Sequence, residues 1–446
     1  MSESLLFLTG HLAYENLCKE LEQLENPAFT YRVENIQVKV AALMTTSIIS
    51  RRLKDVSGID RIILPGLVSG DLPALSEQFG VPFEHGPRDL RDIPEYFGQK
   101  NRVSDLSEHA VLIFAEIVDA PHLTVEEIIQ SAEHYRREGA DVIDVGCLPG
   151  VPFPHLQETV KSLKSEGFVV SVDSLEVEDL LAGGNAGADY LLSLKESTLW
   201  VADEVSSTPV IIPEQQHDME SLYRAIDTMT KAEKSFFADP VLDPFPFGFT
   251  DSVVRYHSLR QRYPDCEILM GTGNVTELVD ADTSGMTAVL LTIIAELNIG
   301  ALLTTQVSQH ARRIVSETDL ARRIMFAAKR DGSLPKRYDA GLMTIHDKKP
   351  FPYTADEIGS LAAAVKDVNY RIQVSQEGVH LYNKDGHVVA SDPFELMPLI
   401  DVKGDLSHMF YLGVELGRAQ IAWQLGKRYL QDNEIEWGVA YRESPA

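Results

Sequence analysis

The sequence predicts an α/β protein whose central part, residues 106–335, folds as a closed (β/α)8 (TIM) barrel. From Val111 onward, short apolar runs alternate with helical windows through eight successive cycles. These runs lack the period-two alternation of a sheet with one solvent-exposed face, which is typical of parallel strands covered by helices. Eight such units in ~220 residues match the size of a closed barrel. An open doubly wound sheet is the alternative.

Each barrel strand is expected as a short run rich in Val, Ile, Leu and Phe. Glycines in the segments EGAD, SEGF and NAGAD are expected to end helices just before the next strand, because glycine readily adopts the left-handed conformation found at helix ends. The predicted strands lie at residues 111–117, 141–146, 168–173, 189–194, 209–213, 235–240, 267–272 and 299–304.

Smaller domains are predicted on both sides of the barrel. Residues 1–105 carry apolar runs at 4–10, 29–33 and 61–66 with helical patterns between them, which indicates a small parallel sheet of the Rossmann or flavodoxin kind. Residues 336–446 are predicted to be α+β, because three short alternating runs joined by turns indicate a β-meander.

One long amphipathic helix is predicted after the meander. Asp405 is its expected N-cap, since aspartate side chains accept hydrogen bonds from free amides at helix starts. An apolar stripe along the segment predicts the amphipathic character of this helix. The stripe consists of Leu406, Phe410, Val414, Ile421 and Leu425.

Charge and cysteine usage exclude several partner classes. The chain has 67 acidic and 40 basic residues and a formal net charge of −27, so neither nucleic acid nor an anionic membrane is expected as a partner. Three scattered cysteines are too few for a disulfide framework or a zinc site. The first residues do not resemble a signal peptide and no apolar stretch is long enough to cross a bilayer. A cytoplasmic protein that acts on small molecules is therefore expected.

The side chains that act in such a barrel lie at the C-terminal ends of its strands and in the loops that follow. Here these positions hold mainly carboxylates and amides. Such groups suit a heterocycle rich in N–H donors, because one carboxylate can accept two parallel hydrogen bonds from it. In strand order, the candidates are Glu116, Asp119, Asp144, Asp173, Ser193, Lys195, Glu214, Asp239, Asp243, Asn274, Thr305 and Gln306.

Three of these strand ends carry motifs that resemble a known family. VVSVDS (Val169–Ser174), DPFPFGF (Asp243–Phe249) and ILMGTGNVT (Ile268–Thr276) look like the pterin-binding barrel family. That family contains dihydropteroate synthase and the methyltetrahydrofolate-dependent corrinoid methyltransferases. The three-domain layout also resembles a dihydropteroate synthase-like group associated with tetrahydromethanopterin biosynthesis.

The resemblance implies a role for each matched residue. Asp173 takes the place of the third-strand aspartate that holds the pterin ring, and Asp243 that of the loop aspartate that bonds to the ring nitrogens. Asn274 matches an asparagine that contacts the ring in the methyltransferase branch. Ser193 stands where the family usually has asparagine, and Phe247 would form one wall of the site. A helix cap, a turn asparagine and core aromatics are the structural alternatives for Asp173, Asn274 and Phe247.

The diphosphate pocket of dihydropteroate synthases is largely missing. The loop CLPGVPFP after the second strand has no threonine or arginine, and the seventh strand ends without a base. Glu116 replaces the first-strand asparagine of the family, and with Asp119 it is predicted to hold Mg²⁺. The local candidates to compensate a departing diphosphate are Lys195, His217, His310 and Arg312. Lys195 is the base expected to do so, and a solvated loop lysine is the alternative.

Three functions follow from the resemblance. The first is a transferase that condenses a dihydropterin-methyl diphosphate with an arylamine, in which Lys195, Asp173 and Asp243 are the catalytic residues. The second is pterin-dependent, corrinoid-linked methyl transfer, and the third is non-catalytic pterin binding. Pairing into a homodimer through the last barrel helix is expected by analogy. Substrate contacts are expected from Glu116, Asp119, Asp144, Asp173, Ser193, Asp243, Phe247, Asn274 and Gln306.

Overall fold

A computed structural model describes residues 2–100 and 104–441. The chain divides into two compact units, one of Met1–Glu108 with Ala327–Tyr338 and one of His109–Phe326 with Asp339–Ala446. The expected domain boundaries near residues 105 and 335 stay predictions. No helix in the described ranges is long and apolar enough to cross a membrane.

The amino-terminal unit is built on a parallel sheet with the order β2-β1-β3-β4. Leu5 and Phe7 face α1 on one side of this sheet, and Leu6 and Leu8 contribute to the core on the other side, because successive strand residues point to opposite faces. The elements are β1 (Glu3–Thr9), α1 (Tyr14–Glu22), β2 (Phe29–Asn35), α2 (Thr46–Arg52), β3 (Arg61–Leu64), α3 (Leu72–Phe79), β4 (Phe83–His85) and α4 (Ile93–Tyr96).

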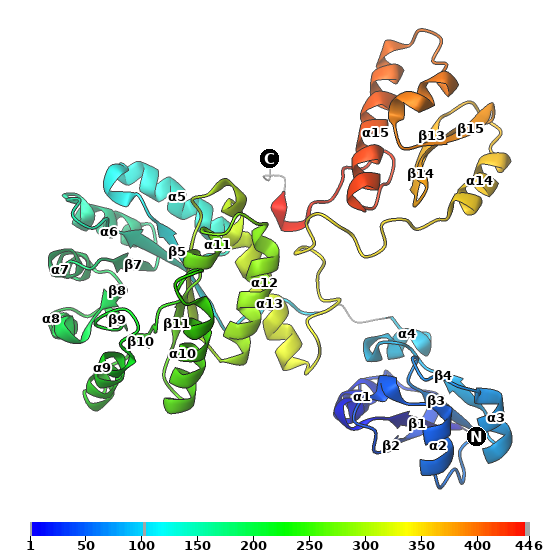
Figure 1. Cartoon of the computed structure of the whole chain (residues 1–446), viewed down its shortest axis with the longest axis horizontal. Coiled ribbons are helices and arrows are strands. Elements are labelled where there is room, and N and C mark those ends of the chain that lie inside the picture. Colours follow the sequence, from blue (N-terminus) through cyan, green and yellow to red (C-terminus); the bar gives the residue numbers. More distant parts are fainter. Residues whose placement is uncertain (1, 101–103, 442–446) are drawn as a thin grey trace. The chain divides into compact units, whose positions relative to one another are not determined.

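The second unit contains the predicted barrel (Figure 1). Its sheet has eight strands in the order β10-β9-β8-β7-β6-β5-β12-β11, and a parallel bridge between Ala238 and Ile268 joins the two ends. The eight parallel strands thus form a nearly closed barrel, which agrees with the predicted fold class and not with the open doubly wound alternative. The strands are β5 (Leu112–Ile117), β6 (Val142–Gly146), β7 (Val170–Asp173), β8 (Tyr190–Leu194), β9 (Thr208–Ile211), β10 (Phe237–Ala238), β11 (Leu269–Gly271) and β12 (Ala301–Thr305).

Helices follow the strands and cover the outside of the barrel. A large apolar cluster that includes Ile113, Ala115 and Ile143 fills the space between strands and helices. A smaller cluster that includes Phe114 and Val142 fills the interior. The helices are α5 (Val125–Glu138), α6 (Leu156–Ser165), α7 (Val177–Ala186), α8 (Val201–Glu204), α9 (Met219–Lys231), α10 (Phe249–Arg262), α11 (Gly273–Thr276), α12 (Thr283–Glu296) and α13 (Ile314–Arg330).

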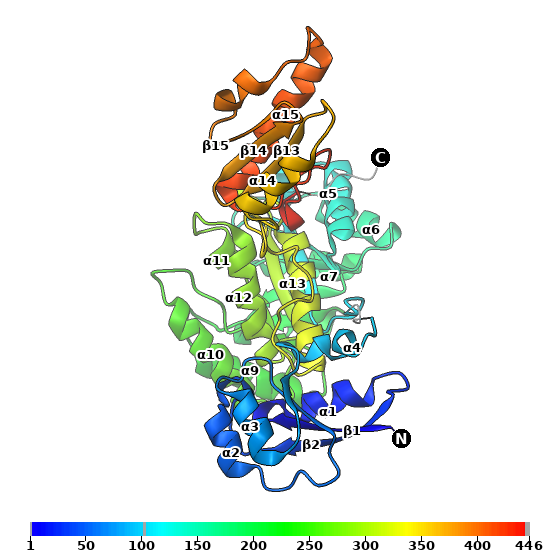
Figure 2. The ribbon, with the colours of Figure 1, turned by 90° about the vertical axis from the view of Figure 1, so that its right-hand side faces the viewer.

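The carboxyl-terminal part contains an antiparallel sheet of β13 (Arg371–Ser375), β14 (Gly378–Asn383) and β15 (Gly386–Ala390), together with α14 (Ala355–Ala364) and α15 (Leu406–Leu425). Figure 2 shows α15 beside this sheet. As predicted, the Asp405 side chain accepts a hydrogen bond from the His408 amide at 3.0 Å.

The apolar stripe identified in the sequence is not the side of α15 that packs on the sheet. Leu406 and Phe410 are 81% and 75% exposed, whereas Leu412, Leu416 and Ala419 are buried against the sheet. The helix has apolar residues on both sides, so periodicity could not identify the side that faces the core. An uncharged apolar face therefore remains at the surface.

Candidate active site at the barrel mouth

Three carboxylates, Glu116, Asp144 and Asp173, gather at the C-terminal end of the barrel. One oxygen from each lies within 4.8 Å of the others. Phe114 and Val142 point into the apolar interior, so Glu116 and Asp144, two residues further along the same strands, point to the same side. Glu116 is paired in register with Asp144. The two-residue period of the strands thus brings these acids together.

Gly146 provides the space for this cluster. It lies two residues after Asp144 and is paired in register with Asp173. A Cβ atom on residue 146 would lie 2.6 Å from Oε1 of Glu116. Any larger residue would therefore displace the Glu116 carboxylate.

Burial raises the pKa of all three acids, none of which forms an ion pair with a basic side chain in the described part of the chain. Loss of water, and then repulsion from Asp173, raises the pKa of Glu116 to about 7. The pKa of Asp144 is raised well above its ordinary value, first by complete burial and then by the neighbouring carboxylates. Burial also raises the pKa of Asp173, partly offset by a hydrogen bond from Ser193 at 2.6 Å. The site therefore favours protons, N–H donors or a cation.

Asp144 is the least satisfied member of the cluster. Its Oδ1 accepts a hydrogen bond from Ser171 at 2.5 Å. Its Oδ2 is buried and has no hydrogen-bond partner in the described residues. An unpaired buried polar atom is costly, so this oxygen marks a place where a ligand would be stabilising.

Asp239, directly after β10, is a fourth buried acid near the cluster. It accepts hydrogen bonds from the Tyr256 hydroxyl at 2.5 Å and the Val241 amide at 2.7 Å. Burial raises its pKa to about 6, and repulsion from Asp173 contributes. Unlike Asp144, Asp239 is thus held by the chain itself.

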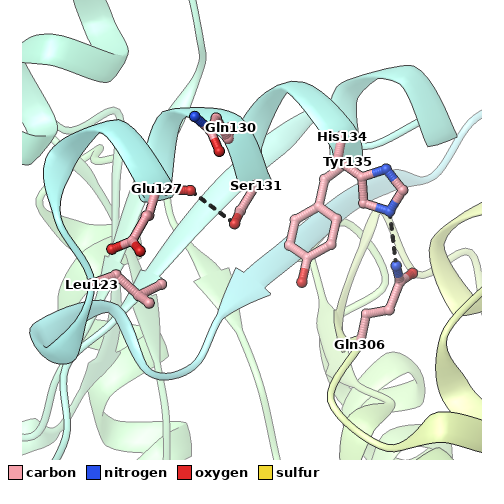
Figure 3. A pocket seen from close by; sticks show the side chains of 7 residues that line it. All are labelled: Leu123, Glu127, Gln130, Ser131, His134, Tyr135 and Gln306. Atoms are coloured by element: carbon pink, nitrogen blue, oxygen red, sulfur yellow. Dashed lines mark hydrogen bonds between the residues drawn. The ribbon is translucent and has the colours of Figure 1, made fainter.

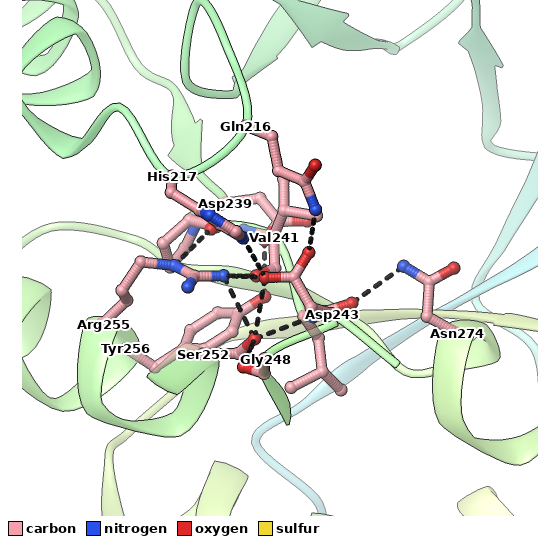
Figure 4. A network of polar contacts seen from close by, with 12 residues as sticks. Gln216, His217, Asp239, Val241, Asp243, Gly248, Ser252, Arg255, Tyr256 and Asn274 are labelled. Carbon is pink, nitrogen blue, oxygen red and sulfur yellow. Dashed lines mark hydrogen bonds and ion pairs between the residues drawn. The ribbon is translucent and has the colours of Figure 1, made fainter. Parts of the chain in front are cut away.

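Asp243 lies in a different environment, a network of donors drawn in Figure 4. Its Oδ1 accepts from Gln216 at 2.9 Å. Its Oδ2 accepts from His217 at 2.9 Å and from Arg255 at 2.5 Å, and Ser252 lies at 3.2 Å. Burial alone would raise the pKa of Asp243, but these donors together lower it below its usual value. The ring contact predicted for Asp243 stays a prediction, and it would have to compete with these partners.

The network contains residues that no sequence motif marks. Arg255 and Ser252 lie on α10, the helix that follows the Asp243 loop, where alternating charge and polarity look like an ordinary solvated surface. His217 lies in the loop after β9. The sequence marked it only as a candidate cation for a departing diphosphate, and not as a partner of Asp243.

The remaining predicted residues are dispersed around the mouth. Asn274 is the second residue of the short helix α11, and its side-chain amide donates to the Leu242 carbonyl at 2.8 Å. Lys195 is half-buried after β8, and no acid of the described chain forms an ion pair with its ammonium. Phe247 is mostly exposed. Asp119 lies just before a 3-10 turn and is not one of the three gathered acids, so the structure groups Glu116 with Asp144 and Asp173 instead.

Gln306 is turned toward α5 rather than toward the acid cluster. Its amide lies 3.3 Å from Nε2 of His134. Figure 3 shows both side chains at a shallow surface depression on α5. The depression is lined by Leu123, Glu127, Gln130, Ser131, His134, Tyr135 and Gln306.

Comparisons with known proteins give the following likenesses. Residues 3–88 match a family of unknown function, DUF6513. The chain is 25% identical to an uncharacterized protein of Methanocaldococcus jannaschii, over 97% of this chain and 98% of that one. A Yersinia pestis dihydropteroate synthase with a pterine-sulfa conjugate is 17% identical, with 51% of this chain and 95% of that chain covered and a TM-score of 0.39. A Coxiella burnetii dihydropteroate synthase in complex with pteroic acid is 17% identical, with 51% and 94% covered and a TM-score of 0.40. The archaeal protein is thus similar along almost the whole chain.

Proposed function

We propose that the barrel mouth binds a dihydropterin and that the protein is a transferase of the dihydropteroate synthase type. The observation that carries this proposal is the cluster of Glu116, Asp144 and Asp173, whose raised pKa values mark a site that favours N–H donors or a cation. A pterin presents adjacent N–H donors from its 2-amino group and N3, and a carboxylate accepts such a pair in bidentate fashion. Hydrogen bonds in a buried site of this kind are strong.

The proposed reaction joins a dihydropterin-methyl diphosphate to an arylamine, as in assembly of folate-type or tetrahydromethanopterin-type cofactors. The C–O bond to diphosphate breaks, the amine nitrogen forms a C–N bond to the methylene carbon, and the nitrogen loses a proton. Asp173, oriented by Ser193, would hold the ring donors. Lys195, whose ammonium has no ion-pair partner in the described residues, would stabilise the departing diphosphate.

Mg²⁺ is part of this proposal as an ion that neutralises diphosphate charge when bound. Hard divalent cations prefer carboxylate oxygens, and the three gathered acids fit that preference. Because Asp173 is assigned to the ring, Glu116 and Asp144 are the ligands we assign to the ion. The partner expected from sequence, Asp119, lies outside the cluster.

A titration with a fluorescent dihydropterin tests the binding proposal. Asp173→Asn removes the charged acceptor and should weaken binding about tenfold or more, which corresponds to ~1.4 kcal/mol. Asp119→Asn is the matched control, because it alters an acid at the same end of the barrel outside the cluster, and it should leave affinity unchanged. Release of diphosphate on addition of arylamines then tests the transferase assignment. Equal affinity of the wild type and Asp173→Asn would remove Asp173 from the site.

Methyl transfer from a methyl-pterin is a second candidate, favoured by one observation. The Asn274 amide is fixed by the Leu242 carbonyl at the end of β11, at the position that resembles the ring-contacting asparagine of the methyltransferase branch. Consumption of methyl-pterin only when a corrinoid protein is added would support this function. Pterin binding with neither reaction would point to a binding protein.

A further inference from the structure

His217 is presented to the barrel mouth by a buried carboxylate. The imidazole is half-exposed, whereas the Asp243 side chain that contacts it is 4% exposed. Asp243 has a lowered pKa and is ionised at neutral pH, so it can only accept, and Nε2 of His217 must donate to it at 2.9 Å. Its other ring nitrogen, Nδ1, forms no hydrogen bond with any described residue, so Nδ1 is the ring atom that is open to a substrate.

The backbone of His217 adopts an energetically unfavourable conformation. Its φ is +69°, in the left-handed region that side chains other than glycine rarely adopt. Such conformations cost energy and persist where the surrounding structure enforces them, often at functional sites. Here the neighbouring Gln216 also donates to Asp243, so consecutive side chains of this strained loop bind the same carboxylate.

Asp243 is in turn held by side chains of α10. Arg255 is 11% exposed, and the same guanidinium nitrogen that contacts Asp243 also donates to the Val241 carbonyl at 2.8 Å. Ser252 accepts from the Asp243 amide at 2.8 Å. The carboxylate therefore cannot rotate toward a ligand without breaking a buried ion pair. A base oriented by a carboxylate that is itself fixed is the arrangement used in general-base catalysis.

This inference rests on the proposed function. We propose that His217 is the general base of the transfer: Nδ1 accepts the proton that the arylamine nitrogen loses as its C–N bond forms and the C–O bond to diphosphate breaks. The proton then passes to water, and the products are the coupled pterin and diphosphate. Asp243 fixes the tautomer and stabilises the imidazolium, while Arg255 and Ser252 are positioning residues. Asp243 thus has a task different from the ring contact that the resemblance implies.

His217→Gln tests the proposal. The glutamine amide can still donate to Asp243, so the loop keeps its contact, but it cannot accept a proton. Dihydropterin affinity should stay at the wild-type value, whereas diphosphate release with arylamine should slow by roughly 10²–10⁴-fold, the usual contribution of a general base. His257→Gln is the control, because His257 is an exposed histidine on α10, and it should behave as wild type.

His217→Ala allows a second test, rescue of the reaction rate by added imidazole. Rescue is not expected if His217 has only a structural role. Added imidazole should restore part of its lost rate, and it should not do so for Asp173→Asn. Wild-type turnover by His217→Gln, or absence of rescue by imidazole, overturns the assignment of the base and leaves the proposed function intact. Failure of the wild type to bind the pterin or release diphosphate overturns both.

Discussion

The cluster of three carboxylates and the single carboxylate of Asp243, at the same end of the barrel, have opposite electrostatic environments. The cluster of Glu116, Asp144 and Asp173 is buried without an ion pair to any basic side chain of the described residues, and the pKa values of its members are raised. Asp243 is also removed from solvent, but its pKa is lowered because Gln216, Arg255 and His217 donate to it. The partners supplied by the following loop and helix therefore decide what a strand-end acid can do. An acid without partners is available for a ligand, and an acid with partners supports its neighbours.

Among the variants that test this contrast, Arg255→Met should cause the largest change in the free energy of unfolding. Arg255→Met leaves the Asp243 charge buried without its cation, and breaking such a pair costs about 3–5 kcal/mol. Urea unfolding measures the change in the free energy of unfolding. Arg224→Met, which breaks the exposed pair with Glu196, should produce no measurable change. An equally small loss for Arg255→Met would contradict the structural role given to the network.

The contributions of Glu116 and Asp243 to the pH dependence of stability should have opposite signs. The pKa of Glu116 is 4.5 ordinarily and about 7 here, so the folded state binds more protons between these values and loses stability as pH rises through them. Glu116→Gln should remove this loss and stabilise the protein at pH 8 by up to about 3 kcal/mol. Asp243 acts oppositely: its stabilisation is present above pH 3.8 and disappears as pH falls. Unfolding curves from pH 4 to 8 that are parallel for wild type and Glu116→Gln would refute the first claim.

Gly146→Ala should disturb the cluster without touching the Asp243 network. The new Cβ would lie 2.6 Å from Oε1 of Glu116, and overpacking of this kind costs about 1–3 kcal/mol. Pterin affinity should fall in parallel, since the acids move apart. Gly285→Ala in α12 is the control: its Cβ would meet nothing within 4 Å, and alanine should stabilise that helix by about 0.5–1 kcal/mol.

Ser193→Ala should have the smallest effect. It removes only the hydrogen bond to Asp173 at 2.6 Å, a contribution of about 0.5–1.5 kcal/mol. Calorimetric titration should show pterin affinity lower by a few fold, with the free energy of unfolding little changed. A loss as large as that of Asp173→Asn would mean that Ser193 contacts the ligand itself.

The sequence predicted the barrel because eight strand-like runs alternate with helical windows. It predicted the acids because they stand at the ends of these runs. Inward and outward residues alternate along each strand, and this alone places Glu116 and Asp144 together. It did not predict that Glu116 gathers with Asp144 and Asp173 rather than with Asp119, because Asp119 lies beyond the strand, where that alternation no longer holds. The network around Asp243 could not be predicted, since Arg255 belongs to a helix whose sequence carries no motif and whose rotation depends on packing.

The exposed side of α15 has a practical consequence for a chain with a net charge of −27. Mutual repulsion keeps copies apart at low ionic strength, but salt shortens its range, and sulfate strengthens the association of apolar surfaces. Leu406, Phe410, Val414 and Ile421 offer such a surface without a single charge. Ammonium sulfate should therefore drive this protein out of solution through one helix, and Phe410→Lys should raise the concentration at which that happens.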